Sequence, residues 1–237
     1  MKKVWKLSLF CLILYPLTCS ALLVTLYGSR NYKLDPKHRH ILSVEDYRKW
    51  EYGDLVYFFN VDRPFDTRTG IYGEFKPRIS FSKVFRREFT MCGLTKDVLL
   101  ASEINFSGTG FRAYLYGLGF TFDVPYFDVL GLNVYARNNP TLKGATWQVT
   151  PVWSYKLELG KLTFWTYGNC DFAGSEGSTY RSNQLYDPRF VIDLGKLFNC
   201  KEGAIWGGIR WEYWRHARGG DETENVPQVL LVWKLQN

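Results

Sequence analysis

The chain has 237 residues and a formal net charge of +7, with 46% hydrophobic and 18% aromatic residues. The first 21 residues hold three of the 30 basic side chains and none of the 23 acidic ones, so the remainder carries +4, with both signs interspersed. This pattern lacks the basic block of nucleic-acid-binding proteins, and we therefore expect no nucleic-acid partner. The 9 Trp, 16 Tyr and 17 Phe residues favour β-strands and membrane interfaces instead.

The N-terminal stretch LSLFCLILYPLTCSALLVTLYG, residues 7–28, carries no charge and follows three lysines. It is long enough for a membrane-spanning helix, but Pro16 interrupts it. We interpret residues 1–21 as a cleaved signal peptide and residues 22–237 as one exported domain. Lipid modification of Cys19 is an open alternative.

Beyond residue 28 the hydrophobic pattern has a period of two. In residues 147–159 the odd positions are Trp, Val, Pro, Trp, Tyr, Leu and Leu, whereas five of the six even positions are polar. Residues 71–82 repeat the pattern, and Gly, Pro and Asn clusters separate such segments at short intervals. We predict twelve antiparallel strands near residues 22–28, 41–47, 53–61, 70–84, 95–106, 111–122, 129–137, 146–159, 161–173, 184–197, 204–216 and 226–235.

Two all-β architectures fit these strands: a soluble sandwich with its apolar faces inside, or an antiparallel transmembrane β-barrel of about 12 strands with them outside. Many segments run to 10–14 residues, which is the length of a tilted strand crossing a bilayer. The segments 29–40, 174–183 and 217–225 would form long loops at one end of a barrel, as membrane barrels require. The segment 85–94 would be a long connection at the other end, for which the pattern gives no reason.

Several ordered segments resemble the nucleoside-specific channel-forming (Tsx-like, OmpK-type) outer-membrane protein family. They are YGDLVYFF (52–59), TGIYGEFKPRISFSKV (69–84), KDVLLASEINF (96–106), FRAYLYGLGF (111–120), TWQVTPVWS (146–154), DFAG (171–174) and VPQVLLVW (226–233). The resemblance implies a monomeric twelve-stranded barrel in the outer membrane of a Gram-negative bacterium, in contact with its lipid. It also implies passive diffusion of nucleosides, and phage or bacteriocin ligands at the outer loops.

Polar and aromatic side chains at the even positions of the segments 70–84 and 146–159, and at matching positions elsewhere, would line the lumen and contact a solute. The alternative is that opposite charges inside a small barrel pair only with one another. Our candidates for the solute path are Tyr72, Glu74, Lys76, Arg78, Gln148, Lys156, Trp165, Tyr167, Asp171, Arg210 and Glu212. We also expect Tyr114, Tyr116, Trp206 and Trp214 to point inwards.

The leading interpretation is an outer-membrane channel for small polar solutes, with no enzymatic activity. A porin-like barrel that serves mainly as a surface or phage receptor, or as a structural protein, is the first alternative. An outer-membrane lipid-modifying enzyme is the second, and the presence of only three His and no paired nucleophile speaks against it. The five Cys have no metal-binding spacing, so we predict no metal and no cofactor.

Overall fold

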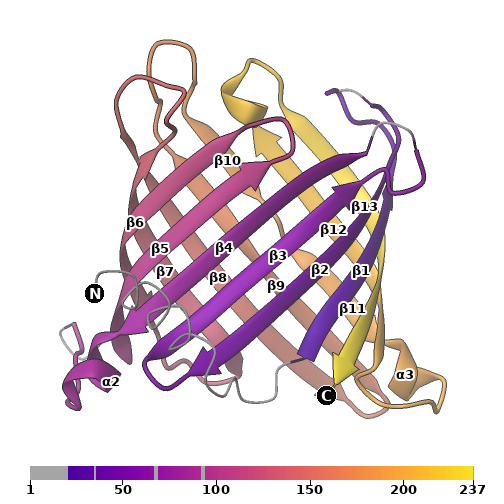
Figure 1. Ribbon diagram of the computed structural model, residues 1–237. Helices are drawn as coiled ribbons and strands as arrows, with labels where there is room; N and C mark the ends of the chain where they lie inside the picture. Colours follow the sequence, from indigo (N-terminus) through magenta and orange to yellow (C-terminus); the bar gives the residue numbers. More distant parts are fainter. Residues whose placement is uncertain (1–20, 35, 67–68, 92–93, 237) are drawn as a thin grey trace, which may run out of the picture.

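The computed structural model describes residues 21–34, 36–66, 69–91 and 94–236. These residues form an antiparallel sheet that closes into a barrel, because β13 pairs with both β1 and β12 (Figure 1). The predicted signal peptide lies outside the described residues, apart from its last residue, which begins β1. The strands are β1 (Ala21–Ser29), β2 (Arg39–Trp50), β3 (Gly53–Asp62), β4 (Gly70–Ser80), β5 (Asp97–Ser107), β6 (Arg112–Thr121), β7 (Phe127–Asn138), β8 (Thr146–Leu159), β9 (Leu162–Ala173), β10 (Asn183–Tyr186), β11 (Arg189–Asp193), β12 (Ile205–Arg215) and β13 (Glu224–Gln236).

The strands β10 and β11 are two halves of one strand position, because both pair with β9 on one side and with β12 on the other. The barrel therefore has twelve strand positions, which confirms the predicted architecture. The interruption falls at Asp187 and Pro188, and proline has no N–H to donate to a neighbouring strand. Gly168 on β9 faces the interruption, where a Cβ would collide with the carbonyl oxygen of Asp187.

The barrel has two different ends, which we call the distal rim and the terminal rim. The distal rim carries the connections 30–38, 63–69, 108–111, 139–145, 174–182 and 216–223; the terminal rim is where β1 begins and β13 ends (Figure 1). The three long loops expected at one end all lie at the distal rim. Most terminal-rim connections are short, and β8 turns into β9 through residues 160–161.

Two predicted strands end earlier than expected because a polar side chain starts a helix there. The segment predicted as 70–84 leaves the sheet at Ser80, whose hydroxyl accepts a hydrogen bond from the Lys83 backbone N–H and caps α2 (Phe81–Phe85). The segment predicted as 184–197 ends at Asp193, which caps α3 (Leu194–Leu197) in the same way. None of the helices among the described residues is long and apolar enough to span a membrane.

Side chains alternate between the interior and the exterior of the barrel, as the period-two pattern predicted. On β4, Glu74 and Arg78 are buried inside, whereas Ile71 and Ile79 are exposed outside. The exterior carries further exposed aliphatic and aromatic side chains on every part of the wall, including Phe59, Leu100, Trp147, Phe190, Ile209, Trp211 and Val229.

The interior also contains an apolar cluster, which the sequence pattern did not indicate. It fills the side of the barrel formed by β9, β11, β12, β13, β1 and β2. Its buried members are Leu23, Tyr27, Ile41, Tyr167, Val191, Trp206, Leu230 and Val232, with Trp165 packed against them. The interior therefore holds an apolar cluster as well as polar groups, and both lie on this part of the wall.

Candidate functional site

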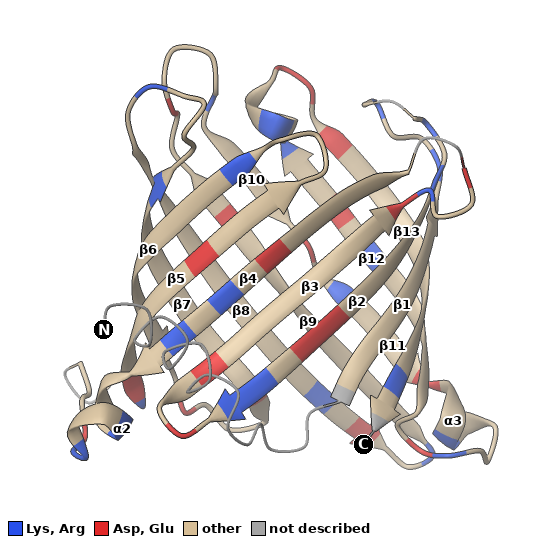
Figure 2. Cartoon of the chain, in the orientation of Figure 1, with Lys and Arg blue, Asp and Glu red and all other residues tan. Residues whose placement is uncertain are grey.

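All eleven residues predicted for the solute path lie on the interior side of their strands, but they join different groups. Four of the strands place them there: β4, β8, β9 and β12. Figure 2 shows residues of both signs along β2 and β4, whereas the charged residues of β5 are both acids. The charged side chains of the interior are organised as ion pairs.

The first group is centred on Lys76. Its ammonium contacts Glu74 on the same strand and lies 3.5 Å from the Glu103 carboxylate on β5. The Tyr72 hydroxyl donates to Glu74 at 2.5 Å. Asp171, on the opposite wall, interacts electrostatically with Lys76 across the lumen. Three carboxylates thus surround one ammonium.

The second group is a hydrogen-bonded chain around Asp171. The Thr150 hydroxyl donates to one carboxylate oxygen of Asp171 at 2.7 Å, and the Asn169 side-chain amide donates to the other at 3.1 Å. Gln148 donates to the Thr150 hydroxyl at 3.1 Å and accepts a bond of 2.7 Å from Arg137. These bonds fix the Asp171 carboxylate in the lumen from β8 and β9.

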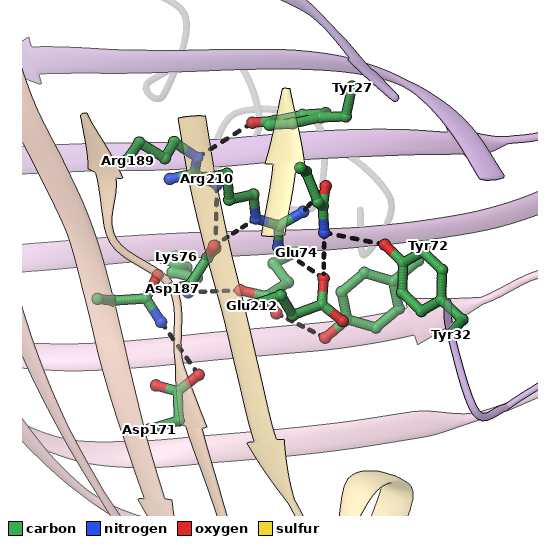
Figure 3. Close-up of polar contacts among 12 residues, drawn as sticks. Tyr27, Tyr32, Tyr72, Glu74, Lys76, Asp171, Asp187, Arg189, Arg210 and Glu212 are labelled. Carbon is green, nitrogen blue, oxygen red and sulfur yellow. Dashed lines mark hydrogen bonds and ion pairs between the residues drawn. The ribbon is translucent and has the colours of Figure 1, made fainter. Parts of the chain in front are cut away.

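The third group forms where β10 gives way to β11. The interruption turns Asp187 inwards, and its carboxylate accepts hydrogen bonds from Arg210 and, at 3.1 Å, from Arg189 (Figure 3). Arg189 also donates to the Tyr27 hydroxyl on β1 at 3.0 Å. Arg210 pairs with Glu212 as well, at 3.4 Å. The break in the strand thus provides the carboxylate that holds two arginines in place.

A loop at the distal rim enters this third group. The Gln228 amide donates to Glu212 at 3.0 Å and to the hydroxyl of Tyr32, in the 30–38 loop, at 2.9 Å. Burial is the main cause of the raised pKa of Tyr32, so the phenol stays uncharged at neutral pH. Glu224 on β13 accepts two backbone N–H bonds from the same loop, at 2.7 and 2.8 Å. The loop is therefore fastened to the inner wall of the barrel.

Arg78, Lys156, Trp165 and Tyr167 lie outside these three groups. Arg78 forms a two-pronged ion pair with Asp54, at 2.7 and 2.8 Å, and its guanidinium also lies 3.3 Å from Asn133 on β7. Lys156 is partly exposed near the terminal rim. Trp165 stacks on Tyr167 with 4.0 Å between ring centroids; Tyr167 belongs to the apolar cluster and Trp165 packs against it.

The expected inward orientation of Tyr114 and Tyr116 is wrong. On β6 the inward residues are Ala113 and Leu115, which are fully buried, whereas Tyr116 on the opposite face is 59% exposed. Both tyrosines line an external cavity beside the 139–145 connection. Trp206 and Trp214 point inwards as expected; Trp206 lies in the apolar cluster, and Trp214 lies 3.4 Å from Asn183.

The sequence analysis missed several residues of these groups. Glu103 stands on the inward face of its strand with Ala101 and Asn105, and the period-two pattern was sufficient to find it. Asp187 and Arg189 gave no such signal, because the strand is interrupted between them. Arg137 was not among the solute-path candidates, but it is the last inward residue of β7.

The central network, defined as the charged residues of the first and third groups together with Asp171, has more acids than bases. It contains five carboxylates and three cationic side chains, a formal difference of −2. The flanking pairs Arg78–Asp54 and Arg137–Glu176 are balanced. The five carboxylates are Glu74, Glu103, Asp171, Asp187 and Glu212, and the three cations are Lys76, Arg189 and Arg210.

In the part of the chain that the structure describes, no group of three or more His, Cys, Asp or Glu side chains is arranged to hold a metal ion. Cys170 and Cys200 are both free thiols. The interior is thus built from ion pairs, hydrogen bonds and aromatic rings, which can bind a solute reversibly.

No protein-family model matches the chain, and no curated protein matches it. Among solved structures it is similar to a KdgM porin, with a TM-score of 0.52 and 8% identity over 90% of this chain and 98% of that one. A KdgM porin in complex with disordered oligogalacturonate gives a TM-score of 0.48, with 8% identity over 90% and 98% of the two chains. A bacterial polysaccharide outer membrane secretin gives 0.44, with 9% identity over 91% and 98%. At 8% identity the first likeness establishes a porin-like fold, and the two scores below 0.5 establish nothing further.

Proposed function

We propose that the chain is a passive channel of a Gram-negative outer membrane, through which small polar solutes diffuse down their gradients. One observation carries the proposal: the closed barrel has exposed apolar side chains outside and a hydrogen-bonded network of charged side chains inside. This arrangement suits lipid on one side of the wall and water on the other. The longer loops of the distal rim then face the cell exterior.

Outward aromatic residues near both rims support the membrane location. Trp147 and Trp211 lie towards the distal rim, and both are about half exposed. Tyr155 and Trp233 lie towards the terminal rim on β8 and β13. Indole and phenol rings favour the two membrane–water interfaces, where one end of the side chain is apolar and the other is hydrated.

The interior favours uncharged, hydroxyl-rich solutes. Its charged groups already bond to one another, so a passing molecule has to replace those bonds with its own. A solute with several donors and acceptors can replace those bonds, whereas an apolar one leaves the polar groups unsatisfied.

Nucleosides fit this chemistry and are the solutes implied by the family resemblance of the sequence. A nucleoside presents sugar hydroxyls for the polar groups of the lumen and a flat base for its aromatic rings. Trp165 and Tyr167 stack beside the Arg189 guanidinium, which lies 5.2 Å from the Tyr167 ring. An acidic oligosaccharide would meet five carboxylates and three cations in the central network, and we expect it to pass poorly.

Flux into vesicles tests the proposal. The refolded protein is inserted into vesicles, and the entry of uridine and adenosine is compared with that of oligogalacturonate. We expect the nucleosides to enter faster, and Arg78→Ala to change their flux because it releases Asp54 and Asn133 from the wall. Arg181→Ala, in a distal-rim loop, is the matched control. No conductance and no nucleoside flux would refute the channel, and faster entry of oligogalacturonate would refute the solute class.

A closed barrel that acts as a surface receptor is the second candidate, and one observation favours it. Three side chains of the lumen have a relative accessible surface of only 1–2%: Gln148, Glu103 and Gln228. Their hydrogen bonds and ion pairs link neighbouring strands. In a receptor these bonds would seal the lumen, and phage or bacteriocin ligands would bind the distal loops. Flux that stays at zero in both the native protein and Arg78→Ala would favour this candidate.

A further inference from the structure

The connection between β4 and β5 at the terminal rim contains a short helix followed by an extended segment, and we call residues 81–91 the rim arm. After Ser80 caps α2, Arg86 adopts a left-handed conformation with φ of 51° and ends the helix. The Ser82 hydroxyl then accepts a hydrogen bond of 2.9 Å from the Phe89 backbone N–H and fastens the extended segment to the helix. The rim arm is therefore an ordered element.

Aromatic side chains hold the rim arm together and remain accessible. The rings of Phe81, Phe85 and Phe89 contact one another in all three combinations, with centroids 5.3 to 6.2 Å apart. Phe85 is nevertheless 60% exposed, and Val84 and Met91 are also exposed. A contiguous apolar surface of this kind on an ordered element marks a place of contact with another apolar phase.

The charge of the rim arm is positive. Lys83, Arg86 and Arg87 are all exposed, and Glu88 is the one acid between residues 81 and 91. The Lys83 ammonium lies 3.3 Å from the Trp50 carbonyl oxygen, and the Arg87 guanidinium lies 4.8 Å from the Phe89 ring. Basic groups thus flank the aromatic surface, in the combination that favours the headgroup layer of an anionic membrane.

The rim arm lies beside the apolar exterior and away from the mouth of the lumen. Figure 1 shows α2 beyond the outline of the strands, on the side of β4 and β5 and at the terminal rim. Ile79 and Leu100, outward residues near the terminal-rim ends of those strands, pair with each other and are exposed. The aromatic surface of the arm therefore lies at the rim next to the apolar exterior of the barrel wall.

We propose that the rim arm is an interfacial anchor, which inserts Phe85 and its neighbours into the bilayer leaflet at the terminal rim and binds anionic phospholipid headgroups through Lys83, Arg86 and Arg87. The inference rests on the membrane location proposed above, but not on the solute. It gives a physical reason for the length of this terminal-rim connection: the connection fixes the depth of the barrel in the membrane.

Labelling tests the anchor. A fluorophore is attached at Phe85→Cys in a background in which the other cysteines of the mature chain are replaced by serine, and the full barrel is inserted into vesicles. The matched control carries the label at Lys201→Cys, in the exposed connection after α3 at the same rim. We expect nitroxide-bearing lipid to quench the label at 85 and aqueous iodide to leave it bright, with the opposite result at 201.

The lipid class is tested with the variant K83Q/R86Q/R87Q. Vesicles that contain phosphatidylglycerol should quench the label at 85 more strongly than purely zwitterionic vesicles, and the variant should lose this difference. Equal quenching by iodide at positions 85 and 201 would overturn the anchor. Protection of position 85 from iodide that increases with the protein-to-lipid ratio would also overturn it, because a second copy of the chain would then cover the arm. Lipid quenching at position 85 that is the same in both kinds of vesicle would overturn the role of the three cations.

Solute flux measured on the same vesicles separates this proposal from the proposed function. Flux without lipid contact at position 85 refutes the anchor alone. Lipid contact at position 85 without conductance or flux refutes the channel alone.

Discussion

The excess of carboxylates in the central network predicts that the channel prefers cations to anions. The network has a formal charge of −2, and the double variant Glu103→Gln with Asp171→Asn brings it to zero, with three carboxylates and three cations. Both replacements keep the size of the side chain and one of its two hydrogen-bond-accepting oxygens. The variant therefore changes the charge while preserving the shape of the lumen.

The expected size of the effect follows from Coulomb's law. An ion about 6 Å from one carboxylate gains or loses about 0.7 kcal/mol even at the dielectric constant of water. Two fully ionised carboxylates, acting with opposite signs on a cation and an anion, change the relative preference by about 2.8 kcal/mol, which is the upper limit of the effect. Screening over a Debye length of ~10 Å at 0.1 M salt leaves about half of this, which corresponds to roughly a tenfold change in the permeability ratio.

The reversal potential in a planar bilayer measures this ratio. Under a tenfold KCl gradient an ideally cation-selective channel would reach about 59 mV, and we expect the native channel to show a substantial part of that value with the cation sign. The double variant should lie near zero. Asp123→Asn is the matched control, since Asp123 is exposed in a terminal-rim loop, and it should leave the potential unchanged. An anion-selective native channel, or a variant with the native potential, would refute the reasoning.

Three further predictions concern folding and processing. Arg210→Ala leaves Asp187 with one arginine instead of two in a buried site, and we expect it to lower the free energy of unfolding by about 3 kcal/mol in urea titrations of vesicle-inserted protein. Gly168→Ala places a methyl group against the Asp187 carbonyl and should cost about 2 kcal/mol in the same titration. N-terminal sequencing of the exported protein should find a start near Leu22; a start beyond the end of β1 would contradict the signal-peptide assignment.

Two controls accompany the folding predictions. Arg181→Ala removes an ion pair with Asp221 in which both side chains are more than half exposed, and it should leave the unfolding midpoint unchanged. Gly28→Ala should also be tolerated, since a Cβ there meets no atom closer than 3.7 Å. If these variants lose as much stability as their buried counterparts, the buried contacts are not the cause.

The sequence was sufficient to predict which face of most strands is apolar, because a strand alternates its side chains whatever its neighbours are. On β8, Gln148, Thr150 and Lys156 point inwards as the period of two requires. The alternation did not predict the inward face of β6, because both faces of that strand carry apolar or small side chains. The face with the smaller side chains, Ala113 and Leu115, points inwards, and the face with Tyr116 points outwards. The curvature of the closed barrel and the space inside it decide between the two faces.

Strand ends and interruptions were harder to predict. Ser80 and Asp193 are good helix caps, but a serine or aspartate within a long period-two pattern is also compatible with a continuing strand. Pro188 indicated an interruption of the strand, but the sequence did not indicate the position of Asp187. In the structure β9 and β12 pair with both β10 and β11 and keep them in line, and Asp187 points into the lumen between them.

The sequence by itself determined that this chain forms twelve antiparallel strands, because alternation and turn residues are local properties. Only the tertiary structure decided how the charges pair. Lys76 with Glu103, Arg78 with Asn133 and Arg189 with Tyr27 join positions 27 to 162 residues apart, and strand pairing and the curvature of the sheet bring them together. The apolar cluster depends on barrel closure, since strands from both ends of the chain become neighbours only when β1 pairs with β13.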